Sequence, residues 1–182
     1  MSPTGRAVRK WWATYLRPEH SRIGEDTPAA RALRARLRRP TTALEVLSER
    51  AVYDLVEALP DLRKRPHDLA QLASVLAAIK SDSDVRLAVL LGRPPENGER
   101  PRMAELRFQR LIRSSGAELE TALRRALPLA GDACDVAALA VDMLDWPHPE
   151  RGERVRINWC FDYFGAARPA SAGEETREDA TA

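Results

Sequence analysis

The chain has few of the residues on which disulfide-bonded and membrane proteins depend. Only two cysteines occur among 182 residues, Cys134 and Cys160, and a long interval separates them. So few cysteines argue against a disulfide framework and make the cytoplasm the expected location. No apolar run reaches the length of about 18 residues that a transmembrane helix needs. The N-terminus is basic but has no apolar core, so no signal peptide is expected.

Residues that usually carry catalysis are also sparse. The three histidines lie far apart, and none has metal-ligand spacing to a cysteine or carboxylate. Gly92 and Gly98 stand among prolines and lack the following Lys-Ser/Thr of a phosphate-binding loop. Asp142 and Asp145 share one side of an expected helix, and we interpret them as a solvated face rather than an acid–base pair. The sequence therefore predicts no enzyme, no metal site and no cofactor.

The alternation of apolar and polar residues that marks a β-strand is missing as well. Apolar residues instead recur at helical spacing through most of the chain. The expected helices span 6–16, 28–39, 42–59, 66–80, 84–91, two short stretches within 103–127, 135–146 and 150–164. The fold class predicted is all-α, a compact helical bundle.

Breaks in this periodicity suggest how the chain is organised. The stretch 92–101 holds three prolines and two glycines in ten residues. It is either a long surface loop of one domain, 1–165, or a linker between two small lobes, 1–91 and 102–165. Residues 166–182 are small, charged and aperiodic, so we expect a disordered tail there.

Arginine is what the chain has in abundance, since only three of its 29 basic residues are lysines. The formal net charge is only +2, but the charge is unevenly spread. Residues 1–39 carry a net charge of +7, and residues 100–125 a net charge of +4. Such asymmetry creates local surfaces for anionic ligands on a nearly neutral protein. A guanidinium group binds phosphate through two parallel hydrogen bonds, which is compatible with nucleic acid, although high-GC coding would produce the same bias.

The stretch 103–127 is the most informative, because it places arginines on two short amphipathic helices. In the first helix the apolar side consists of Ala104, Phe108 and Leu111, and the other side of Arg102, Arg110 and Arg113, with Arg107 at the border. In the second helix the apolar stripe consists of Leu119, Ala122, Leu123, Ala126 and Leu127, and Arg124 and Arg125 lie off it. Between them, Ser114-Ser115-Gly116 is interpreted as a turn rather than as a nucleophile site. Several guanidinium groups along one surface are what phosphate neutralisation needs, whereas the alternative is exposed charges paired with neighbouring acids.

The aromatic residues form two groups along the sequence. Trp11, Trp12 and Tyr15 occupy one expected helix. The second group lies near the C-terminal end and consists of Trp146, Trp159, Phe161, Tyr163 and Phe164. Aromatics interleaved with arginine can stack on unpaired bases, but the apolar spacing here favours core packing or a protein interface.

The stretch 103–127, the preceding Leu91-Gly92-Arg93, and the ending Trp159 with Asp162-Tyr163-Phe164-Gly165 together resemble the small subunit of type I-E CRISPR Cascade complexes, the CasB family. The resemblance extends over 31–166 and is most specific in 107–125.

This resemblance implies an all-α, non-catalytic, cytoplasmic subunit of a surveillance complex guided by CRISPR RNA (crRNA). The implied partners are crRNA, target DNA, the displaced single strand, the other Cascade subunits and a second copy bound head to tail, with no membrane and no cofactor. Basic surfaces of the family lie along the guide–target heteroduplex and the displaced strand and stabilise the R-loop. Base pairing reads the sequence in such complexes, so the protein needs only contacts to the nucleic-acid backbone.

The same resemblance implies which residues bind nucleic acid. Basic positions of the family match Arg38, Arg39, Arg107, Arg113 and Arg125, and another matches Arg65 at the start of an expected helix. Gly116 stands where some members have arginine, which shifts that contact to Arg110, and Arg124 completes the candidate set. A different hypothesis is a helical protein–protein adaptor whose arginines only solubilise it. A third, a small hydrolase or nuclease, would need a carboxylate or histidine cluster assembled across helices.

Overall fold

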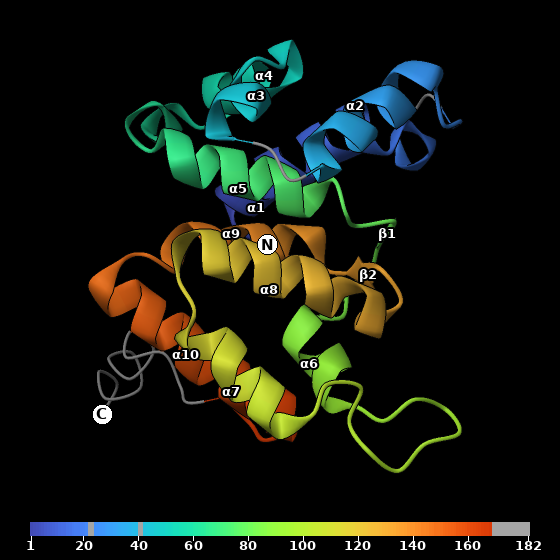
Figure 1. The fold of residues 1–182 in the computed structure, drawn as a ribbon, viewed down its shortest axis with the longest axis vertical. Coiled ribbons are helices and arrows are strands. Elements are labelled where there is room, and N and C mark those ends of the chain that lie inside the picture. The colour runs from blue at the N-terminus through green and yellow to red at the C-terminus, as the bar shows by residue number, and fades with distance from the viewer. Residues whose placement is uncertain (22–23, 40–41, 169–182) are drawn as a thin grey trace, which may run out of the picture.

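The computed structural model describes residues 1–21, 24–39 and 42–168, and it confirms the all-α fold class (Figure 1). The α-helices are α1 (Pro3–Trp11), α2 (Pro28–Arg38), α3 (Ala43–Leu47), α4 (Arg50–Ala58), α5 (Pro66–Leu76), α6 (Leu87–Gly92), α7 (Glu105–Arg113), α8 (Gly116–Ala126), α9 (Val136–Asp145) and α10 (Pro149–Phe164). Single turns of π- or 3-10-helix are η1 (Trp12–Leu16), η2 (Pro18–His20), η3 (Pro60–Lys64) and η4 (Leu127–Ala130).

Several helix ends follow directly from capping residues in the sequence. The Thr27 hydroxyl accepts a hydrogen bond from the backbone N–H of Ala30 at 3.2 Å, and Pro28 occupies the first turn of α2. The predicted helix 42–59 is wrong in one respect, because it breaks at Ser48 and Glu49 into α3 and α4. Val46 and Val52 lie six residues apart and would face different sides of a continuous helix. The break allows both to be buried.

The expectation of no strand is also wrong in detail. Ser81–Asp82 (β1) pairs in parallel with Ala133–Cys134 (β2). Each strand has only two residues, so an alternating sequence pattern has no room to appear. This short pair lies where the chain passes between the two halves of the molecule (Figure 1).

The helices form two stacked halves, with α1 to α5 in one and α6 to α10 in the other (Figure 1). The halves meet where α1 packs against α9 and where α5 packs against α8 and α9. One cluster of buried side chains continues through both. Helix α6 precedes the proline-rich loop and α10 follows it, yet the two pack together. The division into lobes 1–91 and 102–165 stays a prediction.

The predicted tail, 166–182, falls mostly outside the described residues, which end at Arg168. The guanidinium Nε of Arg168 donates to the Asp162 carboxylate at 2.7 Å. Disorder of 169–182 therefore stays a prediction. None of the helices in the described ranges is both long and apolar enough to span a bilayer.

Most of the aromatic residues lie in the core, as their spacing predicted. The buried ones are Trp11, Trp12, Phe108, Trp146, Trp159 and Tyr163. Trp146 and Trp159 meet edge to face, with ring centroids 5.2 Å apart. Phe164 differs, because it is 60% exposed at the end of α10.

The interpretation of Asp142 and Asp145 as a solvated face is wrong for Asp142. Its side chain is buried, and its carboxylate accepts hydrogen bonds from Arg86 at 2.9 Å and from the Trp159 indole N–H at 2.8 Å. Asp145 remains at the surface and pairs with Arg151 at 2.8 Å. The difference arises because α10 packs over one side of α9 and covers Asp142.

Candidate nucleic-acid interface

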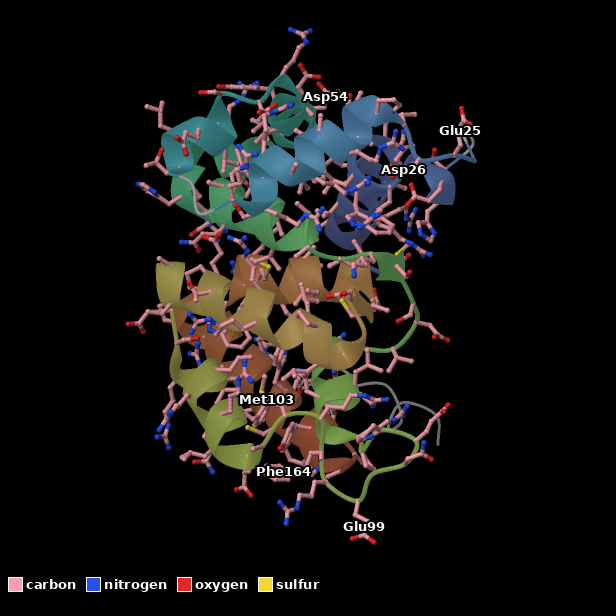
Figure 2. The ribbon with its side chains drawn as sticks, turned by 45° about the vertical axis from the view of Figure 1, so that its right-hand side comes forward. Glu25, Asp26, Asp54, Glu99, Met103 and Phe164 are labelled. Carbon is pink, nitrogen blue, oxygen red and sulfur yellow. The ribbon has the colours of Figure 1, made fainter. Side chains whose placement is uncertain are left out.

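A groove of about 550 Å³ runs between α7 and α8. Its lining residues are Met103, Ala104, Leu106, Arg107, Arg110, Leu111, Ser114, Glu118, Ala122 and Arg125. Arg107 and Arg110 come from α7 and Arg125 comes from α8, so the structure brings three of the predicted arginines to one concave surface. Met103, labelled in Figure 2, lies just before the start of α7.

The local sequence explains why the two helices fold back on each other. Ser114 and Ser115 are extended, and Gly116 begins α8 with a φ of +52°, in the left-handed region that favours glycine. The Ser114 hydroxyl donates to the Leu111 carbonyl at 2.6 Å. The predicted turn is therefore confirmed, and it places arginines of both helices around one groove.

Burial of the apolar stripes fixes which way the arginines face. Phe108 and Leu111 of α7 and Leu119 and Leu123 of α8 are buried, as predicted. The prediction that Ala104 lies on the buried side of α7 is wrong. Ala104 is exposed at the N-cap of α7, and the preceding Met103 is buried instead.

Helix α7 is attached to α10 by aromatic stacking. The rings of Phe108 and Tyr163 are parallel within 9°, with centroids 3.9 Å apart. The Tyr163 hydroxyl donates to the Met103 carbonyl at 2.6 Å. Burial raises the pKa of Tyr163, so this hydroxyl keeps its proton and remains a donor at neutral pH. This contact anchors the α7 wall of the groove.

The groove arginines remain available to a ligand. Arg107, Arg110 and Arg125 are exposed, and none forms an ion pair within the described ranges. Arg107 makes one long hydrogen bond, 3.4 Å, to the carbonyl of Arg125. Two other lining residues, Leu106 and Glu118, were not among the predicted site residues. Leu106 is 62% exposed and gives the basic groove an apolar patch.

Other predicted arginines do not line this groove. Arg113 is exposed at the C-terminal end of α7. Arg124 is three-quarters covered, donates to the Arg38 carbonyl, and pairs with Glu120 at 3.5 Å. It therefore ties α8 to the end of α2. Arg38 is half-buried, and its Nε donates to the Arg34 carbonyl at 3.3 Å.

The remaining predicted residues lie elsewhere in the fold. Arg39 is exposed at the end of α2, beside a shallow cavity that Glu45 and Glu49 also line. Arg65 joins α5 to α9, because it pairs with Asp68 at 2.6 Å and donates to the Leu144 carbonyl at 2.7 Å. Because both partners belong to the protein itself, the main role of Arg65 is structural.

Arg34 of α2 also has internal partners and does not reach the surface. Its side chain is buried and forms two hydrogen bonds to Asp26, at 2.8 and 2.7 Å. A third hydrogen bond joins it to the Leu16 carbonyl at 2.5 Å. Because α2 packs against η1, the arginine that faces this contact is covered.

The described residues bring together no group of three or more His, Cys, Asp and Glu side chains that could hold a metal ion. Burial raises the pKa of the Cys134 thiol above its usual range, so this cysteine stays protonated at neutral pH and is a poor nucleophile. The exposed arginines of the groove are side chains able to bind anionic groups.

Comparison with known proteins identifies the family. The model of the family described as CRISPR-associated protein Cse2 matches residues 33–164. A CRISPR-associated protein Cse2 of Thermus thermophilus is 31% identical over 119 residues, which cover 65% of this chain and 68% of the relative.

Two solved structures have a similar fold. The crystal structure of CasB from Thermus thermophilus matches with a TM-score of 0.57 and 25% identity, and that of a Cse2-family protein from the same species with a TM-score of 0.57 and 24% identity. Each match covers 91% of this chain and 100% of the other. The chain therefore belongs to the Cse2 family of CRISPR-associated proteins, the CasB family that its sequence resembles.

Proposed function

We propose that this protein is a non-catalytic subunit of a crRNA-guided type I-E Cascade complex that binds nucleic acid through arginine–phosphate contacts. It stabilises the complex and the R-loop along the displaced strand and the guide–target heteroduplex. The α7–α8 groove supports this proposal, because three exposed arginines converge there without ion-pair partners in the described residues. Contacts of this kind do not depend on base sequence.

The energetics of R-loop formation are consistent with a contribution from a few arginine–phosphate contacts. The heteroduplex formed is about as stable as the DNA duplex it replaces, so the exchange is nearly balanced. A few contacts to the displaced strand, each worth roughly 1 kcal/mol, are then enough to shift it. Arg107, Arg110 and Arg125 are the main contacts in this proposal, with Arg113 and Arg39 extending the surface.

The salt dependence of binding tests the proposal directly. We expect the assembled complex to hold fluorescein-labelled single-stranded DNA with an affinity that falls steeply between about 50 and 200 mM salt. Strands of unrelated sequence should bind alike. An affinity that does not change with salt concentration would contradict phosphate contacts and favour the adaptor hypothesis, in which the arginines only solubilise the protein.

Contacts to protein partners have a separate basis in the structure. Leu44 and Tyr53 on α3 and α4 are exposed, as are Leu106 on α7 and Phe164 on α10. Helices α3 and α4 lie at one end of the long axis and α7 at the other (Figure 1), and Phe164 lies near that second end (Figure 2). Exposed apolar side chains at both ends support head-to-tail association of two copies within Cascade and contacts to its other subunits.

Absence of nuclease activity is a further prediction. No carboxylate cluster able to hold Mg²⁺ occurs in the part of the chain that the structure describes, and Asp142 is engaged by Arg86 and Trp159. Purified protein with Mg²⁺, Mn²⁺ or Zn²⁺ should leave labelled DNA and RNA intact on gels. Cleavage that survives stringent purification and disappears in Asp142→Asn or Asp145→Asn would refute the non-catalytic assignment.

A further inference from the structure

The turn between α7 and α8 is held from outside the groove by a single tryptophan. The indole N–H of Trp146 donates to the Ser114 carbonyl at 3.1 Å. Ser114 is the C-cap of α7 and also lines the groove. The hydrogen bond therefore joins the end of α9 to the point at which the groove arginines of α7 and α8 are connected.

Trp146 is itself held firmly, so it can act as a fixed support. Its side chain is 2% exposed, and its ring packs edge to face on Trp159 of α10. Arg156 donates to its carbonyl at 3.3 Å. A Cβ at Gly152 would lie only 2.1 Å from the same carbonyl oxygen, so α10 approaches the Trp146 backbone directly.

The two walls of the groove rest on different parts of the molecule. Helix α7 is anchored on α10 through Phe108 and Tyr163. Helix α8 packs against α5, and Arg124 links it to α2 through the Arg38 carbonyl. The position of the turn therefore decides how the arginines of the two walls are placed relative to each other.

We propose that Trp146 is a positioning residue for nucleic-acid binding, whose indole N–H fixes the turn at Ser114 and so sets the spacing of Arg107 and Arg110 from Arg125. This inference rests on the proposed function of the groove. Trp146 is buried and touches no nucleic acid itself. Its effect arises because one strand must reach arginines on both walls at once, and a displaced turn costs the strand one of those contacts.

The test replaces Trp146 with phenylalanine and uses Trp159→Phe as a matched control. Both changes remove a buried indole N–H from the same aromatic cluster, but Trp159 donates to Asp142 and not to the turn. We expect both variants to lose a similar few degrees of thermal midpoint. Only Trp146→Phe should bind single-stranded DNA in the assembled complex about 5- to 10-fold more weakly, with a log–log salt slope flattened by about 0.7, the value of one phosphate contact.

A second variant keeps the test valid if Trp146→Phe does not fold. Benzothienylalanine at position 146 has the size and shape of tryptophan but carries sulfur in place of the N–H, so packing against Trp159 is preserved. It should reproduce the weaker binding and flatter slope. Hydrogen exchange of the amides in 114–119 should be faster in both Trp146 variants and unchanged in Trp159→Phe.

The possible results separate this inference from the proposed function. Wild-type affinity and slope in the Trp146 variants, or an equal loss in Trp159→Phe, would overturn the positioning role. If the arginines of the groove are replaced and binding is unchanged, the groove is not the nucleic-acid surface and the proposed function fails. If that replacement weakens binding while both Trp146 variants bind normally, only the positioning role is refuted.

Discussion

Replacing Arg107, Arg110 and Arg125 together with alanine is expected to weaken binding of single-stranded DNA by the assembled complex about 100-fold, at roughly 1 kcal/mol for each lost contact. The three side chains are exposed on the groove, so the variant should keep its circular dichroism, thermal midpoint and assembly. The log–log salt slope should flatten by about two units, since each phosphate contact to a single strand contributes about 0.7. Fluorescence anisotropy at several salt concentrations gives both quantities.

The matched control removes the same charge from elsewhere. Arg63, Arg100 and Arg154 are also exposed, and none of them lines the groove. Their triple replacement with alanine should lower affinity only slightly, through the change in net charge. Equal losses in the two triple variants would mean that overall charge, rather than the groove, attracts nucleic acid. Adding Arg113→Ala to the groove variant measures how far the surface extends along α7.

Asp142→Ala is expected to destabilise the protein by about 3 kcal/mol, which corresponds to a thermal midpoint lower by roughly 10 °C for a domain of this size. The carboxylate is buried and accepts from both Arg86 and Trp159. Alanine leaves the buried Trp159 N–H without its acceptor and removes one of the two carboxylates that pair with Arg86, the other being Asp162 at 3.4 Å. The cost of the unsatisfied buried donor adds to that of the cavity. Differential scanning calorimetry measures the change.

The neighbouring Asp145 provides the control for this prediction. It lies one helical turn away and pairs with Arg151, whose side chain is about half exposed. An exposed ion pair contributes about 0 to 1 kcal/mol, so Asp145→Ala should shift the midpoint by no more than about 3 °C. Similar midpoints in the two variants would contradict the structural role of Asp142.

The pH dependence of stability distinguishes Asp142 further. Burial raises the pKa of its carboxyl, and the Arg86 guanidinium and the Trp159 N–H offset only part of this rise. The native protein thus holds the proton more tightly than the unfolded chain. This contribution to stability is fully present below about pH 4, the ordinary pKa of aspartate, and is lost as pH rises through the raised pKa. The thermal midpoint of the wild type should therefore fall relative to that of Asp142→Asn as pH rises from about 4 to 7. The opposite trend would refute a raised pKa at Asp142.

The sequence by itself determined the fold class and the buried faces of the two helices that form the groove. Helical spacing of Phe108, Leu111, Leu119 and Leu123 identified the buried faces of α7 and α8 and left the arginines outside. Ser114-Ser115-Gly116 identified the turn. These features depend on residues close together in the chain, where periodicity and turn preferences act directly.

Only the tertiary structure decided which polar residues are used internally. Arg34, Arg65 and Arg124 have the same side chain as the groove arginines, but their partners come from other segments of the chain. Arg34 donates to Leu16 and Asp26, Arg65 donates to Leu144, and Arg124 donates to Arg38. Asp142 was expected to be solvated, but α10 covers it. The physical reason is that helical periodicity gives the direction in which a side chain leaves its own helix axis, but not which other element packs against it. The packing of that other element decides whether a charged group is exposed to water, paired inside the protein or available to a ligand.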